Sequence, residues 1–107
     1  MSGKPLPRAL DQAYARSPHF VGRRIGSEYV LVPLAARGAD LDSILNLNHV
    51  AAFVWERLDG QRSGRMIVAA IVKQFQVEGP QAAADYAELV DTLLELRAIV
   101  PAGQGGR

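Results

Sequence analysis

The sequence contains no cysteine among its 107 residues. A disulfide framework, a thiolate metal site, an iron–sulfur cluster and a cysteine nucleophile are therefore excluded for this chain. Aromatic residues make up only 7% of it, and it lacks the run of about 18 apolar residues that crosses a membrane. The first residues lack the apolar stretch of about 7–15 residues found in a signal peptide. We therefore expect a cytoplasmic protein that does not contact a membrane.

Hydrophobic residues are plentiful, at 49% of the chain, and the length fits one domain of about 50–250 residues. Three of the six prolines lie within residues 1–18. We expect this segment to be a flexible N-terminal arm, with a short helical turn around Leu10–Ala15. The core domain is predicted over residues 19–100, and the glycine-rich segment 101–107 is predicted to be a disordered tail.

Three short strands are predicted in the first half of the chain. Phe20–Ile25 and Tyr29–Val32 are rich in β-branched and aromatic residues, and Gly26-Ser27 between them suits a two-residue type II′ turn. Leu41–Leu47 places alternate leucines on one face, as a half-buried strand does. The expected sheet is antiparallel.

Three helices follow. Asn48 is the predicted N-cap of the first, which ends at Asp59-Gly60, and Ser63 is the predicted N-cap of the second. Pro80 suits the first position of a third helix over residues 80–97. The predicted fold class is α+β, a three-helix bundle with a helix-turn-helix arrangement and an N-terminal three-stranded antiparallel sheet.

The third helix carries two apolar rows, rotated from each other by about 100°. One row has heptad-like spacing: Ala82, Tyr86, Leu89, Leu93 and Leu96. The other has small residues in its first half: Ala83, Ala87, Val90 and Leu94. Either the first row packs on the core while the second leaves a shallow groove, or both form one broad buried stripe.

Residues for catalysis or metal binding are scarce. His19 and His49 are the only histidines, and neither has a partner at metal-ligand spacing. Gly60, Gly64 and Gly79 fall at predicted turns and caps rather than in a phosphate-binding loop. We therefore predict no catalytic residue, no cofactor and no metal site, and expect that the chain is not an enzyme.

Several stretches between about residues 19 and 100 together resemble the PqqD family, named for coenzyme pyrroloquinoline quinone (PQQ) synthesis protein D. The most specific is the passage ending in Trp55-Glu-Arg-Leu-Asp-Gly60, followed by Arg62-Ser63. The others are Asp42–Asn48, Ala52, Ile67, Ile71, Phe75-Gln-Val77, Asp85 and Leu93–Ile99.

This resemblance implies a winged-helix-like peptide recognition element. Such a protein is a non-catalytic chaperone that binds the leader of a ribosomally synthesised precursor peptide. It presents the peptide to a modifying enzyme, often a radical S-adenosylmethionine (SAM) protein, as in PQQ biosynthesis. The implied partners are therefore the precursor peptide and that enzyme.

A peptide chaperone needs an unpaired strand edge beside an apolar groove. In β-strand addition, main-chain hydrogen bonds supply affinity and pockets for alternate side chains supply specificity. The candidate peptide-binding residues are Ser43, Ile44, Leu45, Asn46 and Leu47 on the edge, with Ala83, Ala87, Val90 and Leu94 on the third helix. The alternative is an ordinary edge, blunted by Asp42.

Two other functions remain open. A helix-turn-helix order suggests DNA binding, but the third helix has only one base, Arg97, against four acids: Asp85, Glu88, Asp91 and Glu95. Phosphates would repel this helix. Basic residues instead dominate residues 1–37, which carry a net charge of +4. The second alternative is an oligomerisation module, in which Ser43–Leu47 pairs with its own copy to form a homodimer.

Overall fold

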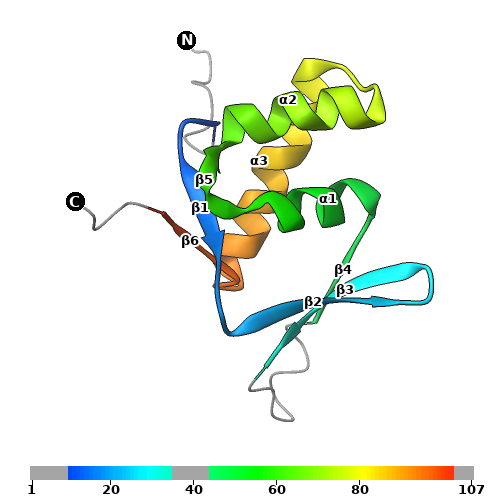
Figure 1. The fold of residues 1–107 in the computed structure, drawn as a ribbon, viewed down its shortest axis with the longest axis vertical. Helices are drawn as coiled ribbons and strands as arrows, with labels where there is room; N and C mark the ends of the chain where they lie inside the picture. The colour runs from blue at the N-terminus through cyan, green and yellow to red at the C-terminus, as the bar shows by residue number, and fades with distance from the viewer. Residues whose placement is uncertain (1–9, 35–43, 103–107) are drawn as a thin grey trace.

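The computed structural model describes residues 10–34 and 44–102. The elements in chain order are β1 (Ala13–Arg16), β2 (Phe20–Ile25), β3 (Glu28–Pro33), β4 (Leu45–Leu47), α1 (His49–Arg57), β5 (Asp59–Ser63), α2 (Gly64–Phe75), α3 (Gly79–Glu95) and β6 (Ile99–Pro101). The strands form two antiparallel sheets of three strands each, in the orders β5-β1-β6 and β2-β3-β4. Both sheets adjoin the helices, and the β2–β3 hairpin extends away from them (Figure 1).

The β2–β3 hairpin confirms the predicted turn. Ile25 pairs with Glu28, which leaves Gly26-Ser27 as the two-residue loop. Gly26 has a φ of 62°, whereas Ser27 does not take a positive φ. A positive φ at the first loop position alone is the pattern of a type II′ turn, which glycine accommodates without strain.

A second glycine positions the hairpin against the first helix. A Cβ atom at Gly22 would lie 2.5 Å from the Tyr29 hydroxyl and 2.8 Å from the Trp55 indole nitrogen. These distances are far shorter than van der Waals contact. Glycine at this position therefore lets β2 pass close to both aromatic rings.

The two-sheet arrangement corrects the expectation of a single sheet. Within Leu10–Ala15, where a short helical turn is expected, Leu10 is 3₁₀-helical and Asp11 lies in a turn. Ala13–Arg16 instead form β1, which pairs with β5 on one side and β6 on the other. Leu10 and Tyr14 are buried in the core, so the part of the expected arm from Leu10 onward packs on the domain. Residues 1–9 of the arm and 103–107 of the tail lie outside the described residues.

Both predicted helix N-caps are confirmed. The Asn48 side chain accepts a hydrogen bond from the Ala51 N–H at 2.8 Å. The Ser63 hydroxyl accepts one from the Met66 N–H at 3.3 Å. The first helix ends at Arg57, close to the predicted stop, but the segment after it forms β5 rather than a simple turn.

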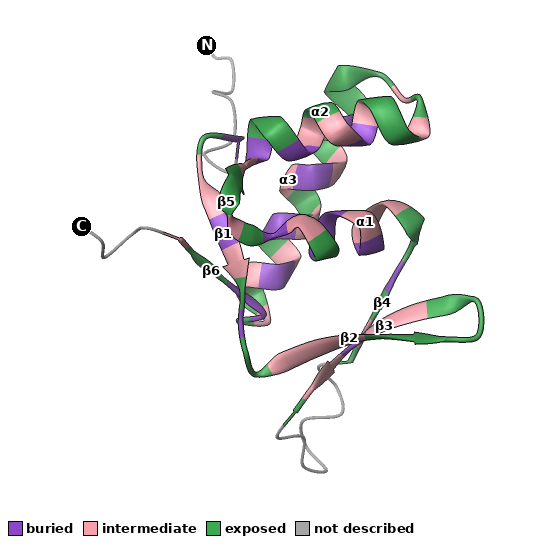
Figure 2. Ribbon diagram, viewed as in Figure 1, coloured by how far each residue is buried: buried purple, intermediate pink, exposed green. Residues whose placement is uncertain are grey.

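The third helix packs through one stripe that combines the two predicted rows. Ala82, Tyr86, Val90 and Leu93 are at most 1% exposed, while Leu89 is only half-buried. Spacings of four, four and three residues follow the 3.6-residue turn of a straight helix, whereas heptad spacing drifts around it. The buried faces of α1, α2 and α3 meet in the centre of the molecule (Figure 2).

Candidate functional site

The strand β4 lies at the end of the β2-β3-β4 sheet, and no described strand pairs with its outer side. Of the predicted strand Leu41–Leu47, Leu45–Leu47 are paired and Ile44 is not part of the strand, while residues 41–43 lie outside the described ranges. An edge of this kind presents main-chain N–H and C=O groups to solvent.

The register shows which backbone groups are free. A two-residue loop makes Ile25 and Glu28 a hydrogen-bonded pair, so alternate β3 residues bond toward β2 and the others toward β4. Tyr29 and Leu31 belong to the second set and stand opposite Leu47 and Leu45. The N–H and C=O of Asn46, between these two leucines, therefore point to the open edge.

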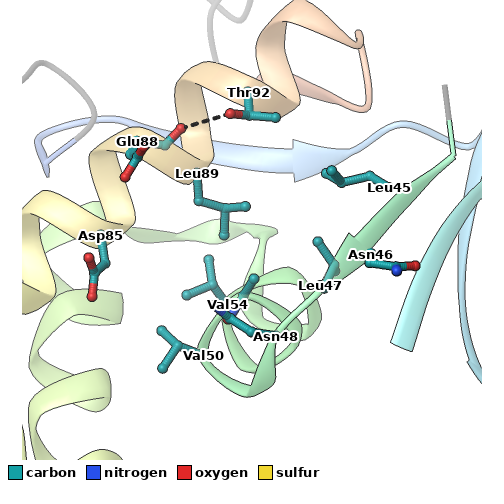
Figure 3. Close-up of a pocket in the computed structure, with 11 residues that line it drawn as sticks. Leu45, Asn46, Leu47, Asn48, Val50, Val54, Asp85, Glu88, Leu89 and Thr92 are labelled. Carbon is teal, nitrogen blue, oxygen red and sulfur yellow. Dashed lines mark hydrogen bonds between the residues drawn. The ribbon is translucent and has the colours of Figure 1, made fainter. Parts of the chain in front are cut away.

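A cavity of about 420 Å³ lies beside this edge. The side chains around it come from β4, the first half of α1 and the middle of α3 (Figure 3). Its lining residues are Leu45, Asn46, Leu47, Asn48, Val50, Ala51, Val54, Asp85, Glu88, Leu89 and Thr92. We call this cavity together with the outer edge of β4 the β4–α3 groove.

Local structure accounts for the two helical sides of the groove. The Asn48 cap starts α1 directly after β4, so the first turns of α1 follow the strand and bring Val50 and Val54 to the groove. On α3, Asp85, Leu89 and Thr92 each precede a buried residue of the stripe. A one-residue step turns a side chain by about 100°, which directs these three to the flank of the helix that faces β4.

The groove is apolar at its centre and acidic along α3. Asp85 accepts a hydrogen bond from Gln81 Nε2 at 2.9 Å. The Thr92 hydroxyl donates to the backbone carbonyl of Glu88 at 3.2 Å. No lysine or arginine is among the described residues that line the cavity. The groove therefore combines an open strand edge, an apolar floor and one negatively charged rim.

The sequence-predicted site residues divide into two groups. Leu45, Asn46 and Leu47 line the groove, and Ile44 beside them is 42% exposed. Ser43 lies outside the described residues.

The second group comprises the site residues predicted on the third helix, and it does not line the groove. Its members are Ala83, Ala87, Val90 and Leu94. Val90 is buried in the core, and Ala83 borders a different hollow between α2 and α3. The rotation of the buried stripe explains the difference, since it turns another face of α3 toward β4. Sequence reasoning missed Asp85, Glu88, Leu89 and Thr92 on that face. Helical periodicity identifies the buried stripe, but it does not show which flank of that stripe faces β4.

The motif Trp55–Gly60, which is the most specific part of the family resemblance, serves the fold. Trp55 and Leu58 are at most 3% exposed. Asp59 Oδ1 accepts the N–H groups of Gln61 and Arg62, and these hydrogen bonds lower the pKa of its carboxyl. Gly60 takes a φ of 82°, a conformation that favours glycine. The motif thus closes α1 and begins β5.

Other site classes find no support in the described part of the chain. Within residues 10–34 and 44–102, no three histidine, aspartate or glutamate side chains gather as metal ligands. None of the helices there is both long and apolar enough to span a bilayer. The β4–α3 groove joins a cavity to an open strand edge.

The fold and groove define an α+β protein with an open sheet edge beside a helical cleft. The chain matches the family described as coenzyme PQQ synthesis protein D (PqqD) over residues 28–99, and it belongs to this family. No protein of curated function matches its sequence.

Two solved structures share the fold. One is TbiB1 in complex with the TbiA(beta) leader peptide, with 22% identity and a TM-score of 0.64, over 79% of this chain and 93% of that one. The other is lasso peptide synthetase B1 complexed with the leader peptide, with 22% identity and a TM-score of 0.67, over 83% of this chain and 99% of that one.

Proposed function

We propose that the protein is a non-catalytic peptide chaperone that binds the leader of a ribosomally synthesised precursor peptide in the β4–α3 groove. The leader adds a strand to β4, and the protein presents the bound precursor peptide to a modifying enzyme. The observation that carries this proposal is the open edge of β4 directly beside a cavity of about 420 Å³.

The chemistry of the groove suits an extended peptide. Asn46 offers an outward N–H and C=O, which an added strand pairs with main-chain groups of its own. Every second side chain of that strand then faces α3, where Leu47, Val54 and Leu89 provide an apolar floor. Main-chain bonding thus supplies affinity, and the floor selects apolar side chains.

Family membership and structural likeness support the same function. The PqqD family is named for a protein of PQQ synthesis, and both structures of the same fold hold a leader peptide. A radical SAM protein or another peptide-modifying enzyme is the expected second partner. A winged-helix-like relation between the helices and the β2–β3 hairpin is part of this proposal.

The test is a titration of isotope-labelled protein with synthetic leader segments of candidate precursor peptides. We expect saturable binding with amide shift changes at Asn46 and along the α3 side of the groove. A scrambled leader of equal composition serves as the control and leaves these amides in place. Absence of binding, or shift changes confined to the β5-β1-β6 sheet, would overturn the proposal.

A further inference from the structure

We propose that the β4–α3 groove selects a leader segment in which a lysine or arginine lies two residues from an apolar residue. This inference rests on the proposed function and concerns the ligand of the same groove. The cavity and the strand edge define the site, and the charges on α3 decide which peptides it prefers.

Two carboxylates form the α3 rim of the groove. Asp85 and Glu88 both line the cavity and lie three residues apart, about 4.5 Å along the helix axis. Among the described residues, the ion pairs join Arg62 to Asp59 and Arg65 to Asp11. Neither rim carboxylate is thus neutralised by a described lysine or arginine, and both are available to a cation from a ligand.

The apolar part of the groove lies next to this rim. Leu89 follows Glu88 directly and projects between α3 and the strand, toward Val54 and Leu47 (Figure 3). Along α3, Asp85 lies on the side of the groove where Val50 is, and Thr92 lies on the side where β4 begins with Leu45 (Figure 3). A peptide along β4 therefore meets acidic groups toward one end and an apolar floor beside them.

Strand geometry gives the spacing. Side chains on the same face of a strand are two residues apart, which is about 6.6–6.8 Å. Asp85 and Glu88 are separated by only about 4.5 Å along α3, so the side chain of one lysine or arginine reaches both carboxylates. The next side chain on the same face of the strand then lies over the apolar floor. The resulting pattern is a basic residue, any residue, then an apolar residue, or the same pattern reversed when the added strand runs in the other direction.

The rim is partly solvated, because Glu88 is exposed and Asp85 half-buried. Exposed ion pairs contribute little individually. Loss of both carboxylates is therefore expected to weaken binding by about fivefold to tenfold rather than abolish it, where tenfold corresponds to about 1.4 kcal/mol. Affinity from main-chain pairing remains.

The experiment uses a displayed library of short linear peptides with randomised positions, selected on the full-length protein. We expect enrichment of a lysine or arginine two positions from an apolar residue. A selected peptide and its Arg→Gln or Lys→Gln counterpart are then titrated against the wild type and the Asp85→Asn/Glu88→Gln double variant. A coupling between the two changes isolates the ion pair from other effects.

A matched control lies on the same helix. Asp91 and Glu95 are exposed and do not line the groove, so Asp91→Asn/Glu95→Gln removes the same charge from α3 elsewhere. We expect this control to bind the selected peptide with nearly wild-type affinity. A Glu88→Lys variant should in turn prefer the peptide in which the basic residue is replaced by glutamate.

The outcomes separate the inference from the proposed function. Selected peptides that lose affinity on Asn46→Pro, yet show no basic enrichment and no coupling to Asp85 and Glu88, overturn the inference and leave leader binding in place. Equal losses in the rim variant and the control variant overturn it as well. Failure to select any peptide, or peptides indifferent to Asn46→Pro, contradicts both.

Discussion

Leu93 lies on the buried stripe of α3 and has no exposed surface. We expect Leu93→Ala to lower the free energy of unfolding by about 2–5 kcal/mol, because it removes buried methyl groups and leaves a cavity. Leu34 is 64% exposed, so Leu34→Ala makes the same chemical change at the surface and should cost little. Chemical denaturation followed by circular dichroism measures both. A similar loss for both variants would contradict the assigned core.

Tyr86 is the largest side chain in the core without exposed surface, and its hydroxyl has no hydrogen-bond partner among the described residues. A buried unpaired hydroxyl bears a desolvation penalty without compensation. We therefore expect Tyr86→Phe to leave the free energy of unfolding at neutral pH unchanged or to raise it. Denaturant titration of both proteins checks this. A loss above about 1 kcal/mol would indicate a hydrogen bond of the hydroxyl in solution.

The same variant should alter the alkaline stability. Burial, with a smaller effect of Tyr14, raises the pKa of Tyr86 to about 12 from a normal value of 10.0. The free energy of unfolding keeps its full value with respect to this group below pH 10. It falls as the pH rises from 10 toward 12, because the tyrosine of the unfolded chain ionises first. A shift of about two units corresponds to roughly 3 kcal/mol. Tyr86→Phe should flatten this part of the stability profile, and an unchanged slope would contradict the buried environment.

At the scale of elements, β4 contributes one free main-chain N–H to the groove, that of Asn46. Asn46→Pro removes this donor from the open side without breaking the bonds of Leu45 and Leu47 to β3. We expect a folded protein whose affinity for a leader peptide falls at least tenfold, about 1.4 kcal/mol. Calorimetric titration, after circular dichroism has verified the fold, gives the measurement.

The matched variant for this strand is Asn46→Val, which changes the side chain but keeps the N–H group. Because the side chain of Asn46 is exposed and faces away from the leucines on either side of it, this variant should retain leader affinity. If the two variants lose affinity equally, the side chain rather than the main chain binds the peptide, and strand addition is wrong.

Local chemistry made the helices and the hairpin predictable. Asn48 and Ser63 are strong N-caps at the right positions, and Gly26 fits a turn that needs a positive φ. Each of these features depends on residues only a few positions apart. The residues of β4 were predictable for the same reason, since alternate leucines indicate a half-buried strand.

The second sheet depends on contacts that the sequence pattern does not show. The strand β5, Asp59–Ser63, has no alternation of apolar residues, yet it pairs with β1 more than 40 positions earlier in the chain. The three-residue β6 pairs with the other side of β1. Tertiary contacts rather than local propensity therefore decide these strands. The groove-facing side of α3 likewise depends on where β4 packs, which the periodicity of the helix does not show.

At the scale of the whole molecule, opposite charges occupy different elements. The α3 rim of the groove is acidic, whereas Arg23 and Arg24 are exposed on the β2–β3 hairpin. A helix-turn-helix protein inserts its recognition helix into the major groove of DNA. In this chain the corresponding helix is the acidic α3, which the DNA phosphates would repel. The basic residues therefore lie on a different element from the acidic rim that is proposed to face the peptide.

The same charges bear on self-association through β4. Pairing of two copies along this edge would bring the acidic rims of both copies, each with Asp85 and Glu88, to the same interface. The carboxylates of the two rims would repel each other, and neither rim has a described cation that offsets this repulsion. The paired length would also be short, because β4 has only three residues. We therefore expect a monomer over a wide concentration range, and a complex with one leader peptide per chain.

Analytical ultracentrifugation over a wide range of protein concentrations, at low and high salt, measures this. A monomer at both salt concentrations agrees with an edge reserved for a foreign strand. A dimer that forms with concentration and dissociates on Asn46→Pro would show that the edge pairs with its own copy, and the oligomerisation module would then be correct. A dimer unaffected by Asn46→Pro would place self-association on another surface and leave the β4–α3 groove open to the leader.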